Sequence, residues 1–268
     1  MSTRTRIIFF TIAWIIVLMP FLFWRSTWFG RPLSEKDIGE YLRDESKPRH
    51  IQHALVQVGE RMARGDAAAR QWYPELVRLA SHRVEEIRTT DAWVMGQDPS
   101  YAAFREPLRG MLNDASPLVR SNAALALVRF GDDSGRAQIL EMLQPVTVTA
   151  PRAGRVADVA QTGDPIRNGT MLARLEGGEE SVEVRAPISG RIHSIAVAAG
   201  AEVKEGDEIG VIDPGTEQVW EALRALYLIG QVEDIAAIQP FQRETPNYPP
   251  RIAEQARATE KAIRERNR

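Results

Sequence analysis

Two neighbouring stretches in the middle of the chain, Val148–Glu176 and Val184–Asp213, repeat one pattern. Each begins Ala-Pro-x-x-Gly-Arg followed by Val or Ile, at an offset of 36, and continues with two glycines at an offset of 37. Residues 145–213 are short alternating runs without a helical period. Each half is therefore predicted to form three strands joined by two glycine turns. Two such halves can interlock into a flattened barrel.

This pattern resembles the biotinyl/lipoyl barrel-sandwich domain, which occurs in swinging-arm carriers and in the membrane-fusion adaptors of secretion and efflux systems. The resemblance covers residues 145–214. It implies that a carrier would bear biotin or lipoate on a lysine at the tip of the hairpin between the halves. Glu179 occupies that position, and no lysine lies between Lys47 and Lys204. We therefore expect neither modification, and no cofactor.

Residues 34–143 read as short amphipathic helices. The clearest unit, Phe104–Gly131, is a helix, a turn with capping residues and a proline, and an alanine-rich second helix. It resembles a HEAT repeat, with a copy of its second helix at Ile87–Gly96 and a looser copy at 41–59. Such recurrence predicts a solenoid in which stacked units share a core. An irregular helical bundle is the alternative.

The helical pattern returns in residues 216–268. The segment 217–230 looks like the second helix of a HEAT unit, with Val219, Leu223, Leu226, Tyr227 and Ile229 as its apolar stripe. Its first helix would be 136–143, before the β domain. The β domain is thus expected to be inserted between paired helices, the alternative being an unrelated terminal bundle. The basic segment 249–268 reads as a capping helix, or as a contact for a membrane surface or an acidic partner.

The N-terminus predicts a membrane anchor. A short basic leader, residues 1–6, precedes eighteen uncharged residues, 7–24, that are long enough to cross the hydrocarbon core. Aromatic and basic residues follow, rather than the small residues of a signal-peptide cleavage site. We expect a retained single span with the bulk of the chain extracytoplasmic, in the periplasm; a buried core helix is the alternative. The fold class expected is α+β multidomain.

Candidate chemistry is sparse. The chain has no cysteine, and 34 Lys and Arg stand against 36 Asp and Glu, which gives no reason to expect nucleic acid. His50 and His53 are three residues apart but lack an evident third ligand, so we expect ordinary surface or capping histidines and no metal. No nucleophile elbow, phosphate loop or HExxH motif occurs. We therefore expect no catalytic residue.

These features favour a membrane-anchored, non-enzymatic scaffold or adaptor that binds protein partners beside a membrane complex, with no small-molecule substrate. One alternative is a periplasmic accessory subunit of a secretion or efflux system. A second is a degenerate carrier protein or lyase-like enzyme.

Overall fold

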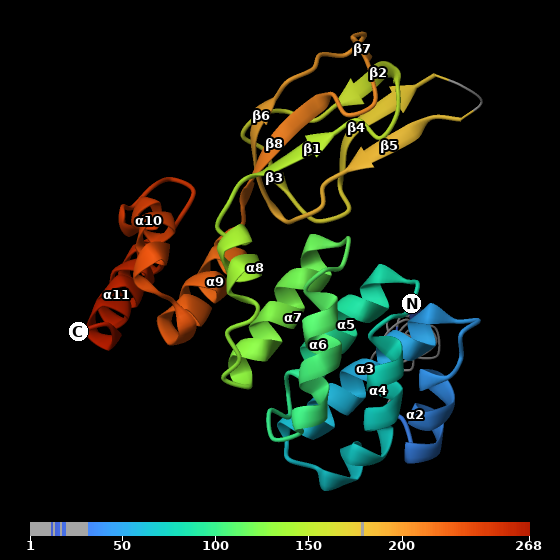
Figure 1. The fold of residues 1–268 in the computed structure, drawn as a ribbon. Helices are drawn as coiled ribbons and strands as arrows, with labels where there is room; N and C mark the ends of the chain where they lie inside the picture. The colour runs from blue at the N-terminus through green and yellow to red at the C-terminus, as the bar shows by residue number, and fades with distance from the viewer. Residues whose placement is uncertain (1–11, 13, 17, 20–31, 178–179) are drawn as a thin grey trace, which may run out of the picture. The chain divides into compact units, whose positions relative to one another are not determined.

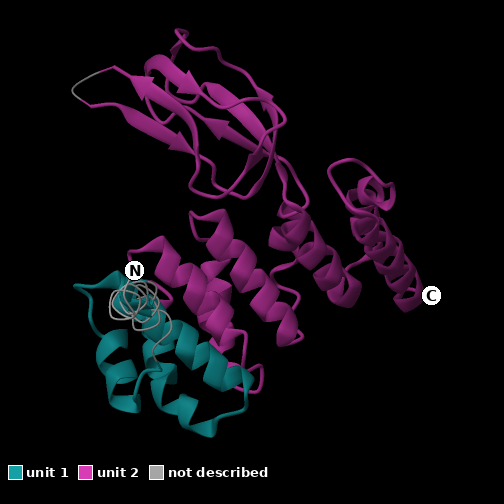
Figure 2. Ribbon diagram, turned by 180° about the vertical axis from the view of Figure 1, so that it is seen from behind, with its two compact units in different colours: residues 1–78 teal, residues 79–268 magenta. Residues whose placement is uncertain are grey.

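The computed structural model describes residues 12, 14–16, 18–19, 32–177 and 180–268 (Figure 1). Contacts divide the chain into two compact units, residues 1–78 and 79–268 (Figure 2). The boundary falls inside the helical region 34–143, which the sequence pattern treats as continuous. The domain limits read from the sequence stay predictions.

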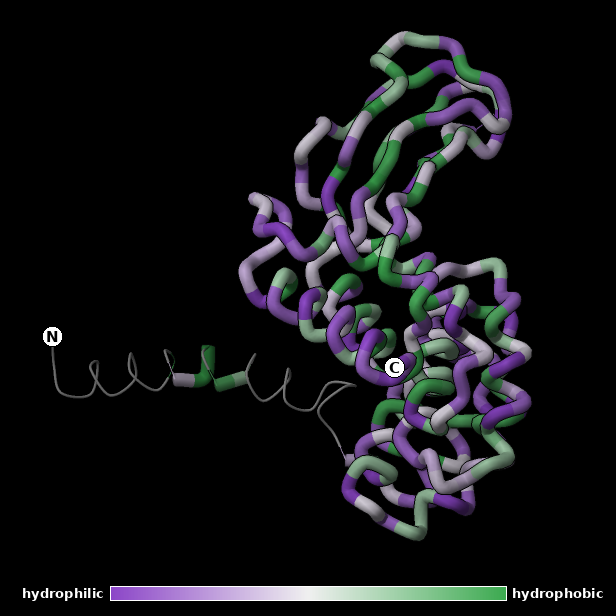
Figure 3. The backbone as a smooth tube through the Cα atoms, turned by 60° about the vertical axis from the view of Figure 1, so that its left-hand side comes forward, coloured by the Kyte–Doolittle hydropathy of each residue, from purple (hydrophilic) through white to green (hydrophobic). Residues whose placement is uncertain are grey.

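The predicted anchor at 7–24 and its leader at 1–6 lie mainly outside the described residues. The six described residues of this segment are helical, and their side chains, Ile12, Trp14, Ile15, Ile16, Leu18 and Met19, are 41–65% exposed (coloured on the N-terminal trace in Figure 3). Within the described part of the chain, no helix has the length and apolar character needed to cross a membrane.

The first unit is helical. Its elements are α2 (Glu35–Leu42), α3 (Pro48–Ala63), the 3-10 helix η1 (Ala67–Trp72) and α4 (Tyr73–Leu79), which ends at the boundary. Ser34 and Asp37 form a capping box that starts α2, and Pro48 opens α3. The core of this unit consists of fully buried aliphatic side chains such as Ile38, Leu55 and Leu76.

The second unit contains paired short helices on both sides of a β domain. The helices are α5 (Glu85–Met95), η2 (Ala102–Phe104), α6 (Arg105–Met111), α7 (Pro117–Arg129), α8 (Arg136–Glu141), α9 (Thr216–Ile229), η3 (Val232–Asp234), α10 (Ile235–Ile238), η4 (Gln239–Gln242) and α11 (Pro250–Arg266). The side chain of Ser116 accepts a hydrogen bond from Val119 N, and Pro117 begins α7. A helical repeat region is therefore confirmed, whereas the HEAT type stays a prediction.

The β domain has eight strands in two sheets. They are β1 (Val146–Thr149), β2 (Gly154–Val159), β3 (Pro165–Ile166), β4 (Met171–Glu176), β5 (Val182–Arg185), β6 (Gly190–Ile195), β7 (Glu202–Val203) and β8 (Glu208–Pro214). The sheet orders are β1-β8-β6-β3 and β5-β4-β2-β7, so exchanging β1–β4 with β5–β8 converts one sheet into the other. Each half contributes two strands to each sheet, which confirms the interlocked β sandwich.

The repeated glycines have repeated structural roles. Gly163, Gly169, Gly200 and Gly206 adopt φ between 77° and 90°, a region that side chains disfavour, so they make the four predicted turns. The strand register shifts just after Val156 and after Ile192, two buried residues at equivalent positions. These two register shifts, or β-bulges, are therefore related by the same internal repeat as the sequence.

Helices α8 and α9 lie side by side although the whole β domain separates them in sequence (Figure 1). Gln218 on α9 donates from Nε2 to the carbonyl oxygen of Met142, at 2.8 Å. The outer strands β1 and β8 are antiparallel partners, with Val146 opposite Ile212. Because the domain's two ends are neighbours, the helix pair closes beneath it.

Candidate functional site

The sequence of the β4–β5 connection predicts that no biotin or lipoate is attached there. Glu179, at the carrier-lysine position, lies outside the described residues. The connection between the two strands, residues 177–181, reads Gly-Gly-Glu-Glu-Ser, and an amide to either cofactor needs an amine. Lys204 lies in a different loop, between β7 and β8. We therefore keep the absence of either cofactor as a prediction from the sequence of the tip.

The two histidines that lie three residues apart, His50 and His53, were predicted to be at the surface but are buried. His50 and His53 on α3 are 8% and 3% exposed. The His50 ring stacks on Tyr41 at 4.1 Å, with its Nδ1 2.8 Å from an Asp44 carboxylate oxygen. The surface prediction is wrong for this pair because α3 turns that face into its unit's core.

The other two histidines make local contacts. Nδ1 of His82 accepts a hydrogen bond from the backbone N–H of Val84, the residue before α5. His193 is exposed, and its Nδ1 lies 3.1 Å from Oδ2 of Asp213. Among the described residues, no three His, Asp or Glu side chains are grouped as metal ligands.

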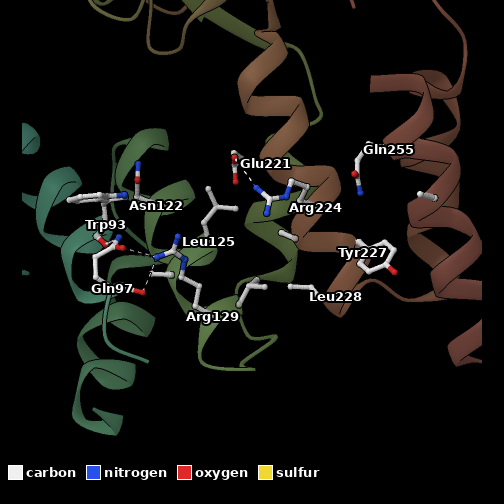
Figure 4. Close-up of a pocket in the computed structure, with 15 residues that line it drawn as sticks. Trp93, Gln97, Asn122, Leu125, Arg129, Glu221, Arg224, Tyr227, Leu228 and Gln255 are labelled. Atoms are coloured by element: carbon white, nitrogen blue, oxygen red, sulfur yellow. Dashed lines mark hydrogen bonds and ion pairs between the residues drawn. The ribbon is translucent and has the colours of Figure 1, made fainter. Parts of the chain in front are cut away.

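A groove of about 710 Å³ lies over α5, α7, α9 and α11 in the second unit (Figure 4). Trp93 and Gln97 lie at one side and Gln255 at the other, with Leu125 and Arg224 between them. Its lining is Trp93, Gly96, Gln97, Asn122, Leu125, Ala126, Val128, Arg129, Glu221, Arg224, Ala225, Tyr227, Leu228, Gln255 and Ala258. We refer to this feature as the groove.

Three large side chains in the groove occupy one repeat position. Trp93 and Tyr227 stand three residues before Gly96 and Gly230, the C-caps of α5 and α9, and Leu125 stands 32 residues after Trp93, inside α7. Trp93 and Tyr227 are 41% and 44% exposed. The sequence pattern placed Tyr227 in the buried apolar stripe of its helix. That prediction is wrong, because its side chain is exposed. The three helices α5, α7 and α9 thus contribute large apolar side chains to one groove.

Among the charged side chains of the groove, two are cationic and one is anionic. Nη1 of Arg129 donates to the carbonyl oxygen of Gly96 at 3.1 Å and to Oε1 of Gln97 at 3.0 Å. Arg224 lies 3.6 Å from Glu221 one turn earlier on α9, and both are about half exposed. The lining thus contains two guanidinium groups and one carboxylate.

Two polar contacts, one partly buried and one fully buried, join the elements around the groove. Arg88 on α5 donates from Nε and Nη2 to both carboxylate oxygens of Asp114, at 2.6 and 2.8 Å. The Arg88 guanidinium beside Asp114 lowers the pKa of that carboxyl below its usual value. At the other wall, the fully buried Thr259 of α11 donates from its hydroxyl to Leu223 O at 2.9 Å. These bonds fix neighbouring helices against each other.

Comparison with known proteins identifies the β part of the chain. Residues 146–212 match the model of the biotin/lipoyl family, described as "Biotin-requiring enzyme". This segment is a biotin/lipoyl domain. It is about a quarter of the chain. No curated protein matches the sequence.

Three solved structures are similar to parts of the chain. A single-chain, multi-domain long-chain acyl-CoA carboxylase is 26% identical over 38% of this chain and 10% of its own, with a TM-score of 0.26. The urea carboxylase of Kluyveromyces lactis is 21% identical over 47% and 10%, with a TM-score of 0.25. A designed armadillo repeat protein is 14% identical over 84% and 80%, with a TM-score of 0.45. The chain spans about a tenth of the length of either carboxylase.

Proposed function

We propose that this chain is a non-enzymatic scaffold, tethered to a membrane, that binds a segment of a partner protein in the groove. The observation that carries the proposal is the row formed by Trp93, Leu125 and Tyr227 on α5, α7 and α9, in which the two aromatic side chains are exposed. Tryptophan, tyrosine and arginine dominate binding energy at protein interfaces, and all three line this groove.

The dimensions of the groove suit an extended segment better than a folded surface. A volume of about 710 Å³ accommodates several side chains, and it spans four helices instead of closing around one small molecule. The helices beneath are cross-linked by the Arg88–Asp114 and Thr259–Leu223 contacts. A rigid groove loses little conformational freedom on binding, which favours affinity.

The biotin/lipoyl domain would serve as a second docking element. Its β4–β5 tip lacks the amine of a swinging arm, which supports a structural over a carrier role. Its insertion between α8 and α9 ties it to the helices on both sides. The role of the domain in this proposal is to hold a second partner, as in the adaptors that it resembles.

The apolar segment 7–24 supports the membrane tether. The six described residues in it are large, helical and exposed, so nothing in the described chain buries them. Exposed apolar helices of this kind are stable in a bilayer and not in water. The proposal places the rest of the chain in the periplasm, beside a membrane complex.

The test is site-specific photocrosslinking in cells. A photoreactive phenylalanine analogue at Tyr227 is compared with the same analogue at Val232, which is exposed in the same unit but does not line the groove. We expect one crosslinked protein from position 227, absent from 232 and reduced when Trp93 is replaced by alanine. The same adducts from both positions, unaffected by Trp93→Ala, would refute the proposed function.

A further inference from the structure

We propose that the segment bound in the groove is extended and acidic, and that one of its carboxylates pairs with Arg129. This inference rests on the proposed scaffold function and specifies the partner's chemistry. It is drawn from the hydrogen bonds of Arg129, the charge of the lining and the spacing of the row.

Arg129 has no carboxylate partner among the described residues, unlike several arginines around it. On the adjoining helices and turns, Arg88 pairs with Asp114, Arg109 with Asp132 and Arg120 with Glu141. No such pair involves Arg129 among the described residues. An exposed guanidinium at the wall of a groove, with no acid of its own, is a site for an acid from outside.

The side chain of Arg129 is also held in position. Only Nη1 makes hydrogen bonds, to Gly96 O and Gln97 Oε1, and these leave Nε and Nη2 without a bond to the described residues. Nε and Nη2 form the edge of the guanidinium that binds both oxygens of one carboxylate. The carbonyl ends of α5 and α7 carry partial negative charge. Binding therefore depends on this paired geometry more than on long-range attraction.

The row of apolar side chains sets the conformation of the segment. Neighbouring packed helices are about 8–10 Å apart. An extended or polyproline-II chain rises about 3.1–3.4 Å per residue, so about three residues span adjacent helices. Polyproline II repeats every three residues, which puts every third side chain on one face. The expected segment has apolar residues three apart above Trp93, Leu125 and Tyr227, with an acid near the first two.

The remaining charges in the lining favour the same sign. Arg224 adds a second cation, and its ion pair with Glu221 is long, at 3.6 Å, and solvent-exposed. Exposed pairs of this kind contribute little stability and rearrange readily. A basic segment would be repelled by two guanidinium groups and attracted by one carboxylate. An acidic segment would be attracted by the two guanidinium groups and repelled by the one carboxylate.

The test uses the full chain in detergent and fluorescently labelled twelve-residue peptides, read by anisotropy. The first peptide has leucine at every third position, proline and serine between, and two glutamates. Two matched peptides carry glutamine or lysine in place of the glutamates. We expect the glutamate peptide to bind about tenfold more tightly than the glutamine peptide, the effect of one charge-assisted hydrogen-bonded pair, and the lysine peptide to bind least.

Variants separate recognition from folding. Arg129→Glu should reverse the order of the three peptides, Arg129→Lys should keep the order with a smaller difference, and Arg83→Glu, an equal charge change outside the groove lining, should leave it unchanged. If Arg129 only caps α5, Arg129→Glu will lower the melting temperature and weaken all three peptides equally. That result overturns the inference.

Two further outcomes keep the inference distinct from the proposed function. Equal binding of the three peptides, lost in Trp93→Ala but unchanged in Arg129→Glu, overturns the acidic partner and leaves the groove as a docking site. Binding of none of the peptides, together with identical crosslinks from positions 227 and 232, overturns both.

Discussion

Nη1 of Arg136 lies 2.8 Å from Oδ1 of Asp234, although 98 residues separate the two in sequence. Arg136 begins α8, before the β domain, and Asp234 follows α9, after it. The Asp234 side chain is 3% exposed, and its second oxygen accepts a hydrogen bond from Gln231 N at 2.8 Å. The pair therefore joins the two sides of the insertion from within the helical region.

Replacing Arg136 by alanine should destabilise the helices around the insertion by about 1–3 kcal/mol, because a buried carboxylate loses its charged partner. The arginine is 30% exposed, which keeps the loss below that of a fully buried pair. Urea unfolding of the full chain in detergent, followed by circular dichroism, measures the change. Arg83→Ala is the control. A shift of less than about 0.5 kcal/mol would mean that the pair contributes nothing.

Acid should weaken the contact between Arg88 and Asp114. The pKa of Asp114 is lowered in the folded chain, so its stabilising effect is complete above the unfolded value of about 3.9 and is lost as pH falls through the lower folded value. Asp114→Asn should cost about 1–3 kcal/mol at pH 7. The difference from wild type should narrow below about pH 4. Unfolding measured at pH 7, 5, 4 and 3 tests this; a constant difference would contradict it.

The equivalent glycines Gly154 and Gly190 should not tolerate alanine. A Cβ at Gly190 would lie 1.9 Å from the carbonyl oxygen of Asp213, and one at Gly154 would lie 2.7 Å from that of Glu176. Both neighbours are backbone, which cannot move aside, so we expect a loss of about 3 kcal/mol or more for Gly190→Ala and less for Gly154→Ala. Peptide-resolved hydrogen exchange across 146–214 locates the effect.

The matched control is Gly110→Ala on α6, where a Cβ meets nothing within 4 Å. This change should stabilise the helix by about 0.5–1 kcal/mol. If hydrogen exchange in the β domain of Gly190→Ala were unchanged, β6 and β8 could move apart to accommodate the methyl group without loss of stability, and the prediction would be wrong.

The full chain should carry no biotin or lipoate. Co-expression with a biotin ligase and a lipoate ligase, followed by intact mass measurement, should give the unmodified mass, because the β4–β5 tip has no amine. Glu179→Lys restores that amine and should allow an adduct on a fraction of molecules. A biotin or lipoyl adduct on the wild-type chain would revive the carrier alternative.

The membrane tether predicts a measurable orientation. A phosphatase reporter that is active only in the periplasm, fused after Arg268, should be active, and it should lose activity when residues 7–24 are deleted. A reporter active only in the cytoplasm, fused at the same place, should be silent. The opposite pattern would place the body of the chain on the cytoplasmic side and exclude the adaptor alternative.

Sequence alone was sufficient for the β domain because its constraints are local. A glycine at each of four turns and a buried Val or Ile after each Gly-Arg specify strand length and bulge position, and the offset of 36 pairs the halves. Helix starts were equally readable, since Ser116 and Pro117 act within one turn of chain.

The groove could not be read in the same way. Tyr227 and Leu226 are adjacent apolar residues on α9, yet one is 44% exposed and the other fully buried. Which of them points inward depends on where α11 packs against α9. That packing is tertiary structure, which the local sequence pattern does not specify. Alignment of the repeat ends at Gly96 and Gly230 was the available signal, because it places Trp93 and Tyr227 at one position. Burial of His50 and His53 likewise depends on packing, not spacing.

The antiparallel pairing of β1 with β8 also makes the neighbouring helices depend on the β domain. While the strands are folded, α8 and α9 behave as if a short loop joined them. If the strands melt, the same two helices must close a loop of about 70 residues, at an added entropic cost of about 2–3 kcal/mol. The two parts should therefore unfold cooperatively, with heat or denaturant releasing α8 from α9 as soon as the sandwich opens.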